Sequence, residues 1–99
     1  MTEIVSYSVY ILRCSDGSFY VGYSADVPER VTAHNNGLGA TWTKRRLPVT
    51  LVYHEPLSTE AAAIARERQL KHWTRDKKLA LINGDLRRLK ELSKSRQVP

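Results

Sequence analysis

The chain has 99 residues, enough for one small domain and too few for two. Its formal net charge at pH 7 is +6, and basic residues concentrate around 44–46, 66–78 and 87–96. A positive excess of this kind suggests a polyanionic partner, of which nucleic acid is the commonest, although it would equally suit a solvated surface.

The single cysteine, Cys14, excludes a disulfide framework and a cysteine-rich zinc site, and its place at the end of an apolar run is typical of a small core residue. Residues 1–6 lack the basic start and the apolar stretch of a signal peptide. No apolar run approaches the roughly 20 residues needed to cross a membrane. These features predict a cytoplasmic protein.

The first two elements are expected to form a β-hairpin. Tyr7 to Cys14 and Phe19 to Ser24 are rich in β-branched and aromatic residues, which favour strands. The intervening Asp16-Gly17 is a strong hairpin-turn signal. Because both runs are largely apolar on both faces, we expect this hairpin near the middle of the domain.

A helix follows the hairpin. Asp26 is suited to cap it, and Pro28 is tolerated in a first turn. The helix is expected to end at Asn35 or Asn36, because Gly37 is a fitting C-terminal stop. Residues 37–48, with two glycines, one tryptophan and three basic residues, are expected to form a loop.

The remaining segments predict one strand and three helices. Alternating side chains over 49–55 are typical of a strand, which Pro56 would end. Capping residues then precede three successive helical patterns. These helices are expected over Glu60 to about Trp73 after Ser58 or Thr59, from Thr74 through Ile82 to Asn83-Gly84, and from Asp85 along Leu86, Leu89 and Leu92.

The predicted order is strand, strand, helix, strand, helix, helix, helix. It is typical of an α+β domain in which helices cover a small antiparallel or mixed sheet. No internal repeat, low-complexity segment or linker divides the chain. We therefore expect a single domain over 1–99, with a core over about 6–83, followed by a last helix and a frayed, basic tail over 85–99.

One carboxylate falls on an expected inward face. Glu67 projects between Ala63 and Leu70 on the helical pattern. A buried or half-buried carboxylate is costly unless it has a partner. That partner can be an arginine such as Arg30, in a purely structural pair, or a divalent metal beside a substrate phosphate. Magnesium suits the second role, because it often takes only one or two protein carboxylates and keeps several waters.

Four more side chains carry chemistry that suits a phosphodiester. Arg30 can bind a phosphate in a planar, bidentate manner, and His34, one helical turn later, can pass a proton. Tyr10 and Tyr20 have phenols with an ordinary pKa near 10, which a metal or a cation would lower. Each also has an ordinary reading: an exposed arginine, a histidine on a helix flank and two core aromatics.

The loop after the first helix combines an aromatic side chain with basic ones. Trp42 can stack on an exposed base, and Lys44, Arg45 and Arg46 can contact a phosphate backbone. Lys71 can line the same path. An ordinary solvated loop would have the same composition.

These residues follow one another in the order of a known family. Ser8-Val9-Tyr10, Tyr20-Val21-Gly22, Arg30 with His34, Glu67, and Asn83 at the end of a helix resemble the motifs of the GIY-YIG endonuclease superfamily. The likeness is to its small, stand-alone, single-domain bacterial type and covers roughly 6–83. Ser8 stands where the name-giving motif has glycine.

The resemblance implies a three-stranded antiparallel sheet flanked by helices, and one-step hydrolysis of DNA with one divalent metal ion, Mg²⁺ or Mn²⁺. Glu67 would hold the metal, which would also stabilise the leaving oxygen. Tyr20 would act as general base or orient the water, and Arg30 would clamp the scissile phosphate. Tyr10 and His34 would hydrogen-bond water or phosphate, while Gly22 and Asn83 would support the site.

The expected function is therefore a metal-dependent DNA endonuclease, structure-selective or weakly sequence-specific, in DNA repair or recombination. Many members of the superfamily carry a separate DNA-recognition domain, for which this chain has no room. Specificity would come from its own basic surface, a protein partner or self-association. Two alternatives are a non-catalytic nucleic-acid-binding module that retains the nuclease fold, and a protein-interaction domain whose charge serves solubility.

Overall fold

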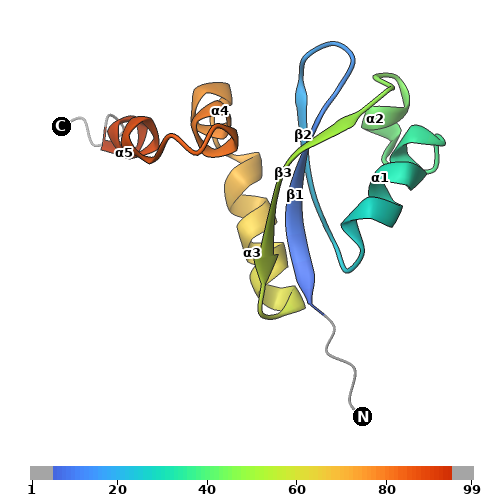
Figure 1. The fold of residues 1–99 in the computed structure, drawn as a ribbon, viewed down its shortest axis with the longest axis horizontal. Coiled ribbons are helices and arrows are strands. Elements are labelled where there is room, and N and C mark those ends of the chain that lie inside the picture. The colour runs from blue at the N-terminus through green and yellow to red at the C-terminus, as the bar shows by residue number, and fades with distance from the viewer. Residues whose placement is uncertain (1–5, 95–99) are drawn as a thin grey trace.

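The computed structural model describes residues 6–94, which form one three-stranded antiparallel sheet between two groups of helices (Figure 1). The α+β class is confirmed. The elements in chain order are β1 (Tyr7–Arg13), β2 (Phe19–Ser24), α1 (Val27–Asn35), α2 (Thr41–Lys44), β3 (Thr50–Leu57), α3 (Glu60–Lys71), α4 (Arg75–Ile82) and α5 (Leu86–Lys94).

The expected hairpin is present, with Ile11 of β1 opposite Val21 of β2. Its turn is held by Asp16, whose carboxylate accepts hydrogen bonds from the backbone and the hydroxyl of Ser18, and Gly17 adopts a φ of 83°. The hairpin lies in the sheet between the two groups of helices, near the middle of the domain, but only β1 is the central strand of that sheet. The sheet order is β2–β1–β3, so β2 is an edge strand. Its apolar side chains are covered by helices on both faces rather than by a further strand.

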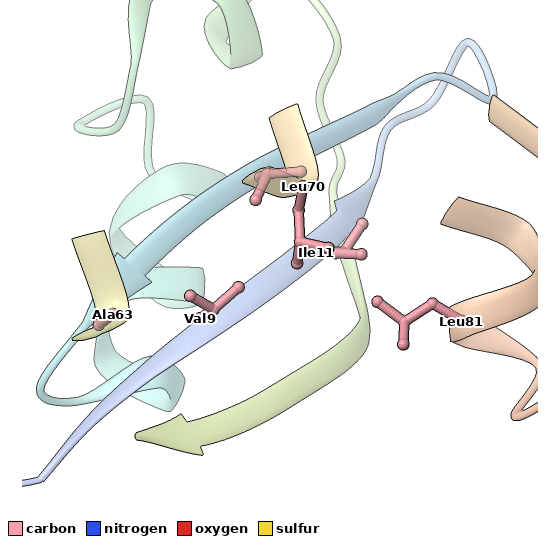
Figure 2. Packing of buried hydrophobic residues seen from close by; sticks show 6 residues of the cluster. Val9, Ile11, Ala63, Leu70 and Leu81 are labelled. Carbon is pink, nitrogen blue, oxygen red and sulfur yellow. The ribbon is translucent and has the colours of Figure 1, made fainter. Parts of the chain in front are cut away.

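The two faces of the sheet have separate cores. On one face, Val9 and Ile11 of β1 pack with Ala63 and Leu70 of α3 and with Leu81 of α4 (Figure 2). On the other face the buried cluster comprises Tyr10, Leu12, Cys14, Val27 and Val49. Because side chains alternate along a strand, β1 supplies both cores from neighbouring residues. The prediction that Cys14 is a small core residue is confirmed.

The C-terminal helices begin where their capping residues predicted. The hydroxyl of Thr59 accepts from the Ala62 amide, that of Thr74 accepts from Lys77, and the Asp85 carboxylate accepts from Arg88. Helix α3 ends at Lys71, slightly earlier than expected. Helix α5 packs on α4, and Leu86 at its start is exposed. Of the tail expected to be frayed, residues 95–99 lie outside the described part of the chain.

Two sequence predictions about the middle of the chain are wrong. The expected loop over 37–48 contains the short helix α2, whose four residues are too few to show a helical period. Strand β3 continues through Pro56 to Leu57 instead of ending before the proline. Proline is tolerated there because β3 is an edge strand, and Pro56 still pairs with Ser8. Within residues 6–94, none of the helices is long and apolar enough to cross a membrane.

Candidate active site

Three of the predicted site residues meet on the α1 face of the sheet. Tyr10 of β1 and Tyr20 of β2 have ring centroids 6.5 Å apart, and the Tyr20 and His34 rings are 5.2 Å apart. The phenol oxygen of Tyr10 lies 2.9 Å from Nε2 of His34. Tyr10 is almost fully buried, whereas Tyr20 is partly exposed. The site therefore has one phenol inside and one at the surface.

Gly22, the last residue of the motif Tyr20-Val21-Gly22, makes room for Tyr10. The two residues are paired across the β1–β2 ladder. A Cβ atom on Gly22 would lie 2.6 Å from Cζ of Tyr10, closer than any stable contact. The support role expected for Gly22 thus has a steric reason, since any side chain there would displace the phenol.

Two residues that hold His34 were missed by the sequence predictions. His34 is fully buried, and its Nδ1 lies 3.0 Å from the hydroxyl oxygen of Thr43 in α2. A Cβ atom on Gly39 would collide with the imidazole ring, so glycine is needed there for the ring to fit. Both residues lie in the segment expected to be a loop. The two glycines of that segment were the one available signal. The expectation of an ordinary histidine on a helix flank is wrong.

Burial sets the protonation of this face. Burial raises the pKa of Tyr10 to about 12, although hydrogen bonding and the positive charge of Arg30 oppose the rise. Burial lowers the pKa of His34, and the charge of Arg30 acts in the same direction. The prediction that a cation would lower a tyrosine pKa gives the direction of the Arg30 effect, but burial outweighs it at Tyr10. At neutral pH, Tyr10 is a phenol and His34 an uncharged imidazole.

Glu67 is half-buried on α3, with its side chain 17% exposed. Its carboxylate lies 3.3 Å from Nζ of Lys71, one helical turn later. Among the described ion pairs, the partner of Glu67 is therefore Lys71 and not Arg30, the arginine considered from the sequence. Burial and the Glu60 carboxylate raise the pKa of Tyr23, and burial raises that of Tyr10. The Glu67 charge adds a smaller rise to the pKa of each. These two tyrosines project from opposite faces of the sheet.

A metal ion at Glu67 would find few other protein ligands. Among residues 6–94, no group of three or more histidine, cysteine, aspartate or glutamate side chains could hold a metal. A single carboxylate suits Mg²⁺, which usually keeps several waters and binds substrate phosphate oxygens. It does not suit zinc, which requires three or four protein ligands. The cationic Nζ of Lys71 already lies where a positive charge is favourable.

The predicted nucleic-acid contacts divide into two groups. Arg46 is held by the fold: its guanidinium lies 3.2 Å from the Asp16 carboxylate and 4.0 Å from the centroid of the Trp42 ring. The Trp42 ring in turn stacks on Tyr20, with centroids 6.2 Å apart. Lys44 and Arg45 are exposed. Of the predicted basic contacts, these two are therefore the ones left open to a phosphate backbone.

Asn83 is separate from this group. It forms the exposed C-cap of α4, on the side of the sheet opposite α1 (Figure 1). Its backbone N–H donates to the carbonyl of Leu79, and the next N–H, of Gly84, donates to that of Leu81. Its geometry indicates support for the end of α4 rather than contact with the tyrosines.

The same fold occurs in known proteins. The family model described as the GIY-YIG catalytic domain matches residues 6–80. A UPF0213 protein of Staphylococcus aureus is 54% identical over 77 residues, which cover 78% of this chain and 94% of that relative. The solution NMR structure of a UPF0213 protein of Bacillus halodurans is similar, with 40% identity, a TM-score of 0.52, and coverage of 79% of this chain and 83% of that one.

A second solution NMR structure, of a protein from E. faecalis, is 33% identical with a TM-score of 0.54, and the match covers 100% of this chain and 95% of that one. The relatives are of similar length to this chain, so the likeness concerns whole small proteins. The resemblance inferred from the motifs is confirmed: the chain belongs to the GIY-YIG catalytic domain family, within a superfamily of endonucleases.

Proposed function

We propose that this protein is a single-domain endonuclease that hydrolyses DNA phosphodiester bonds with the help of one divalent metal ion. The observation that carries the proposal is that four groups act on one side chain, the Tyr10 phenol. Tyr10 contacts His34 directly, and the charges of Arg30 and Glu67 and the neighbouring Tyr20 all act on its phenol. A guanidinium, a carboxylate, an imidazole and two phenols suit phosphodiester hydrolysis.

Glu67 would hold the metal, Mg²⁺ or Mn²⁺. Its side chain is mostly shielded from solvent, and its ion pair with Lys71 supports a position that suits a positive charge. The ion would supply charge neutralisation at the phosphate and at the leaving oxygen. When it binds, the Lys71 ammonium would turn from Glu67 toward the phosphate backbone, which reconciles its observed pairing with the expected role in DNA binding.

The two tyrosines have different roles in this proposal. Tyr10 keeps its proton because its pKa is about 12, and its phenol is engaged with buried His34. Tyr20 is partly exposed and is therefore the phenol that can reach a water molecule and orient its attack. Arg30, half-buried on α1, would bind the scissile phosphate and stabilise charge that builds in the transition state.

The DNA would approach over α2. Lys44 and Arg45 are exposed there, and Trp42, stacked on Tyr20, is 39% exposed next to the reacting groups. These contacts read the backbone and the presence of an exposed base, but no base sequence. They support a structure-selective or weakly specific enzyme of DNA repair or recombination. A DNA substrate and one buried, unpaired cysteine both fit the reducing cytoplasm.

Plasmid cleavage tests this proposal directly. Supercoiled plasmid is incubated with the protein and Mg²⁺ or Mn²⁺, with and without chelator. Wild-type protein is expected to nick or cut, whereas Glu67→Ala is expected to lose cleavage and keep most of its DNA binding. Glu91→Gln on α5 is the matched control, because its exposed pair with Arg88 contributes little to stability.

The alternative function, a binding module that retains the fold, predicts a different result. Such a protein would bind DNA in a salt-dependent manner but would not cut it with either metal. A Glu67→Ala variant that cuts at the wild-type rate would reject the metal assignment. A protein without salt-dependent DNA affinity would reject both the nuclease and the binding module.

A further inference from the structure

A chain of buried hydrogen bonds extends inward from the Tyr10 phenol. The phenol oxygen lies 2.9 Å from His34 Nε2, and His34 Nδ1 lies 3.0 Å from the Thr43 hydroxyl oxygen. That hydroxyl lies 2.8 Å from the carbonyl oxygen of Ala40. Tyr10, His34 and Thr43 are each at most 1% exposed. Among residues 6–94, no buried side-chain polar atom lacks a hydrogen-bond partner, so the proton positions along this chain have to be consistent with one another.

The inner end of this series of hydrogen bonds, at Thr43 and Ala40, indicates which nitrogen of His34 carries the proton. The Ala40 carbonyl can only accept, so the Thr43 hydroxyl donates its proton to it. With that proton committed, the Thr43 oxygen accepts a hydrogen bond from His34. Nδ1 of His34 therefore carries the proton, and Nε2 is left as an acceptor.

The outer end leads independently to the same result. A buried phenol proton needs an acceptor, because an unsatisfied buried donor is costly. Arg30, whose charge acts on the phenol, has only donors to offer. Within the described part of the chain, Nε2 of His34 is the acceptor that lies within hydrogen-bond distance of the Tyr10 oxygen. The phenol thus donates inward, and its lone pairs remain available to Arg30.

We propose that Thr43 is a positioning residue: it fixes His34 in the Nδ1–H tautomer, which makes Tyr10 donate inward and accept from Arg30. Thr43 acts through two intermediate side chains and contacts no substrate. Gly39 contributes by leaving the space in which the imidazole ring can take this orientation. The tautomer follows from the hydrogen bonds alone, whereas its value for DNA cleavage rests on the proposed function.

Removing the Thr43 hydroxyl would free His34 to reverse its tautomer. With a proton on Nε2, His34 would donate to the Tyr10 oxygen and occupy a lone pair that is otherwise available to Arg30. Tyr10 would then lose its inward acceptor, and its oxygen would be a poorer acceptor for the Arg30 guanidinium. Removing a group that hydrogen-bonds and orients a functional side chain typically lowers activity by about 10- to 100-fold.

Nitrogen NMR of the imidazole tests the tautomer without any measurement of activity. The experiment uses a background variant, called the parent, in which His54→Gln and His72→Gln remove the two exposed histidines. His34 is then the one histidine of the protein. Long-range ¹H–¹⁵N spectra at neutral pH are expected to show a protonated Nδ1 and an unprotonated Nε2. Thr43→Val, which matches the shape of threonine, is expected to shift His34 toward the Nε2–H form. Thr43→Ser is expected to retain the parent pattern.

Either of two spectra would overturn the inference: a parent protein with its proton on Nε2, or a folded Thr43→Val variant with an unchanged tautomer. The parent spectrum decides the first point even if Thr43→Val does not fold. In plasmid cleavage, Thr43→Val is expected to lower kcat about 10-fold or more with little change in KM, and Thr43→Ser to restore it. If the parent cuts no DNA under any condition, the proposed function fails, while the NMR comparison still decides the role of Thr43.

Discussion

The two faces of the sheet use the same central strand for different purposes. On the α3 face, Val9 and Ile11 pack against Leu70 in an apolar core. On the α1 face, the intervening Tyr10 is equally buried but is joined to His34 by a hydrogen bond. An apolar contact tolerates small shifts, whereas a buried polar group requires a partner at a defined position. The side chains of β1 are therefore apolar on the α3 face and partly polar on the α1 face, while Glu67, the proposed metal ligand, comes from α3.

This comparison predicts that substitutions on the α1 face will reduce activity more than stability. Arg30→Ala is expected to slow plasmid cleavage by about 100- to 1,000-fold, the usual effect of a lost transition-state donor. Its half-exposed position on α1 implies little loss of stability. Single-turnover cleavage and thermal unfolding of the same variant measure both quantities. A tenfold or smaller loss of rate would assign Arg30 a structural role instead.

A substitution in the core of the α3 face should instead reduce stability more than activity. Leu70 is fully buried on α3, so Leu70→Ala is expected to lower the free energy of unfolding by about 2–5 kcal/mol. The fraction that remains folded should keep the wild-type cleavage rate. Urea unfolding gives the first quantity, and cleavage below the unfolding transition gives the second. A lost rate in the folded fraction would show that the two faces are coupled.

The pH dependence of stability should also come from the α1 face, through the buried His34. Burial lowers the pKa of His34, so below about pH 6.5 the unfolded chain binds a proton that the folded chain does not. Stability should therefore fall as the pH drops from 7 toward 5. In His34→Gln, whose overall stability will be lower, this dependence should weaken. Melting temperatures of both proteins across the range give the comparison, and equal slopes would contradict the assignment.

The smallest effect is expected at the rim of the site. Lys44 and Arg45 are exposed beside the α1 face, and each phosphate contact contributes about 0.9 to the slope of log K against log salt concentration. Replacing both with alanine should make the fall of log K with log salt concentration less steep, by up to about 2 in slope, without affecting the fold. Arg87→Ala with Lys90→Ala on α5, remote from α1, is the matched control. A larger effect of the control pair would move the DNA path to α5.

Much of the fold could be predicted because its signals are local. Asp26, Thr59, Thr74 and Asp85 act on backbone groups three residues away, so the starts of these four helices were visible in the chain. Helix α2 was missed because it has no side-chain cap and too few residues for a period. The extent of β3 was wrong because tolerance of Pro56 depends on the strand lying at an edge, which is a property of the sheet.

The gathering of side chains on the α1 face was predictable, but not all of their contacts. The motifs grouped Tyr10, Tyr20 and His34, and their rings lie close together. The pairing of Glu67 with Lys71 is an i, i+4 contact within one helix, which the helical pattern already allows. The pairing of Arg46 with Asp16 follows from positions that only the folded chain defines. Thr43 and Gly39 gave no sequence pattern, because their importance comes from contact with a ring on another helix.

The sequence by itself thus determined most of the elements, the family and the chemical groups, since caps, turns and motif residues act at short range or through identity alone. Only the tertiary structure decided which strand is central, how deeply Tyr10 and His34 are buried, and which atoms donate or accept between them. Burial and hydrogen-bond direction depend on groups brought together from distant parts of the chain. Protonation at this site is therefore a property of the fold rather than of any one motif.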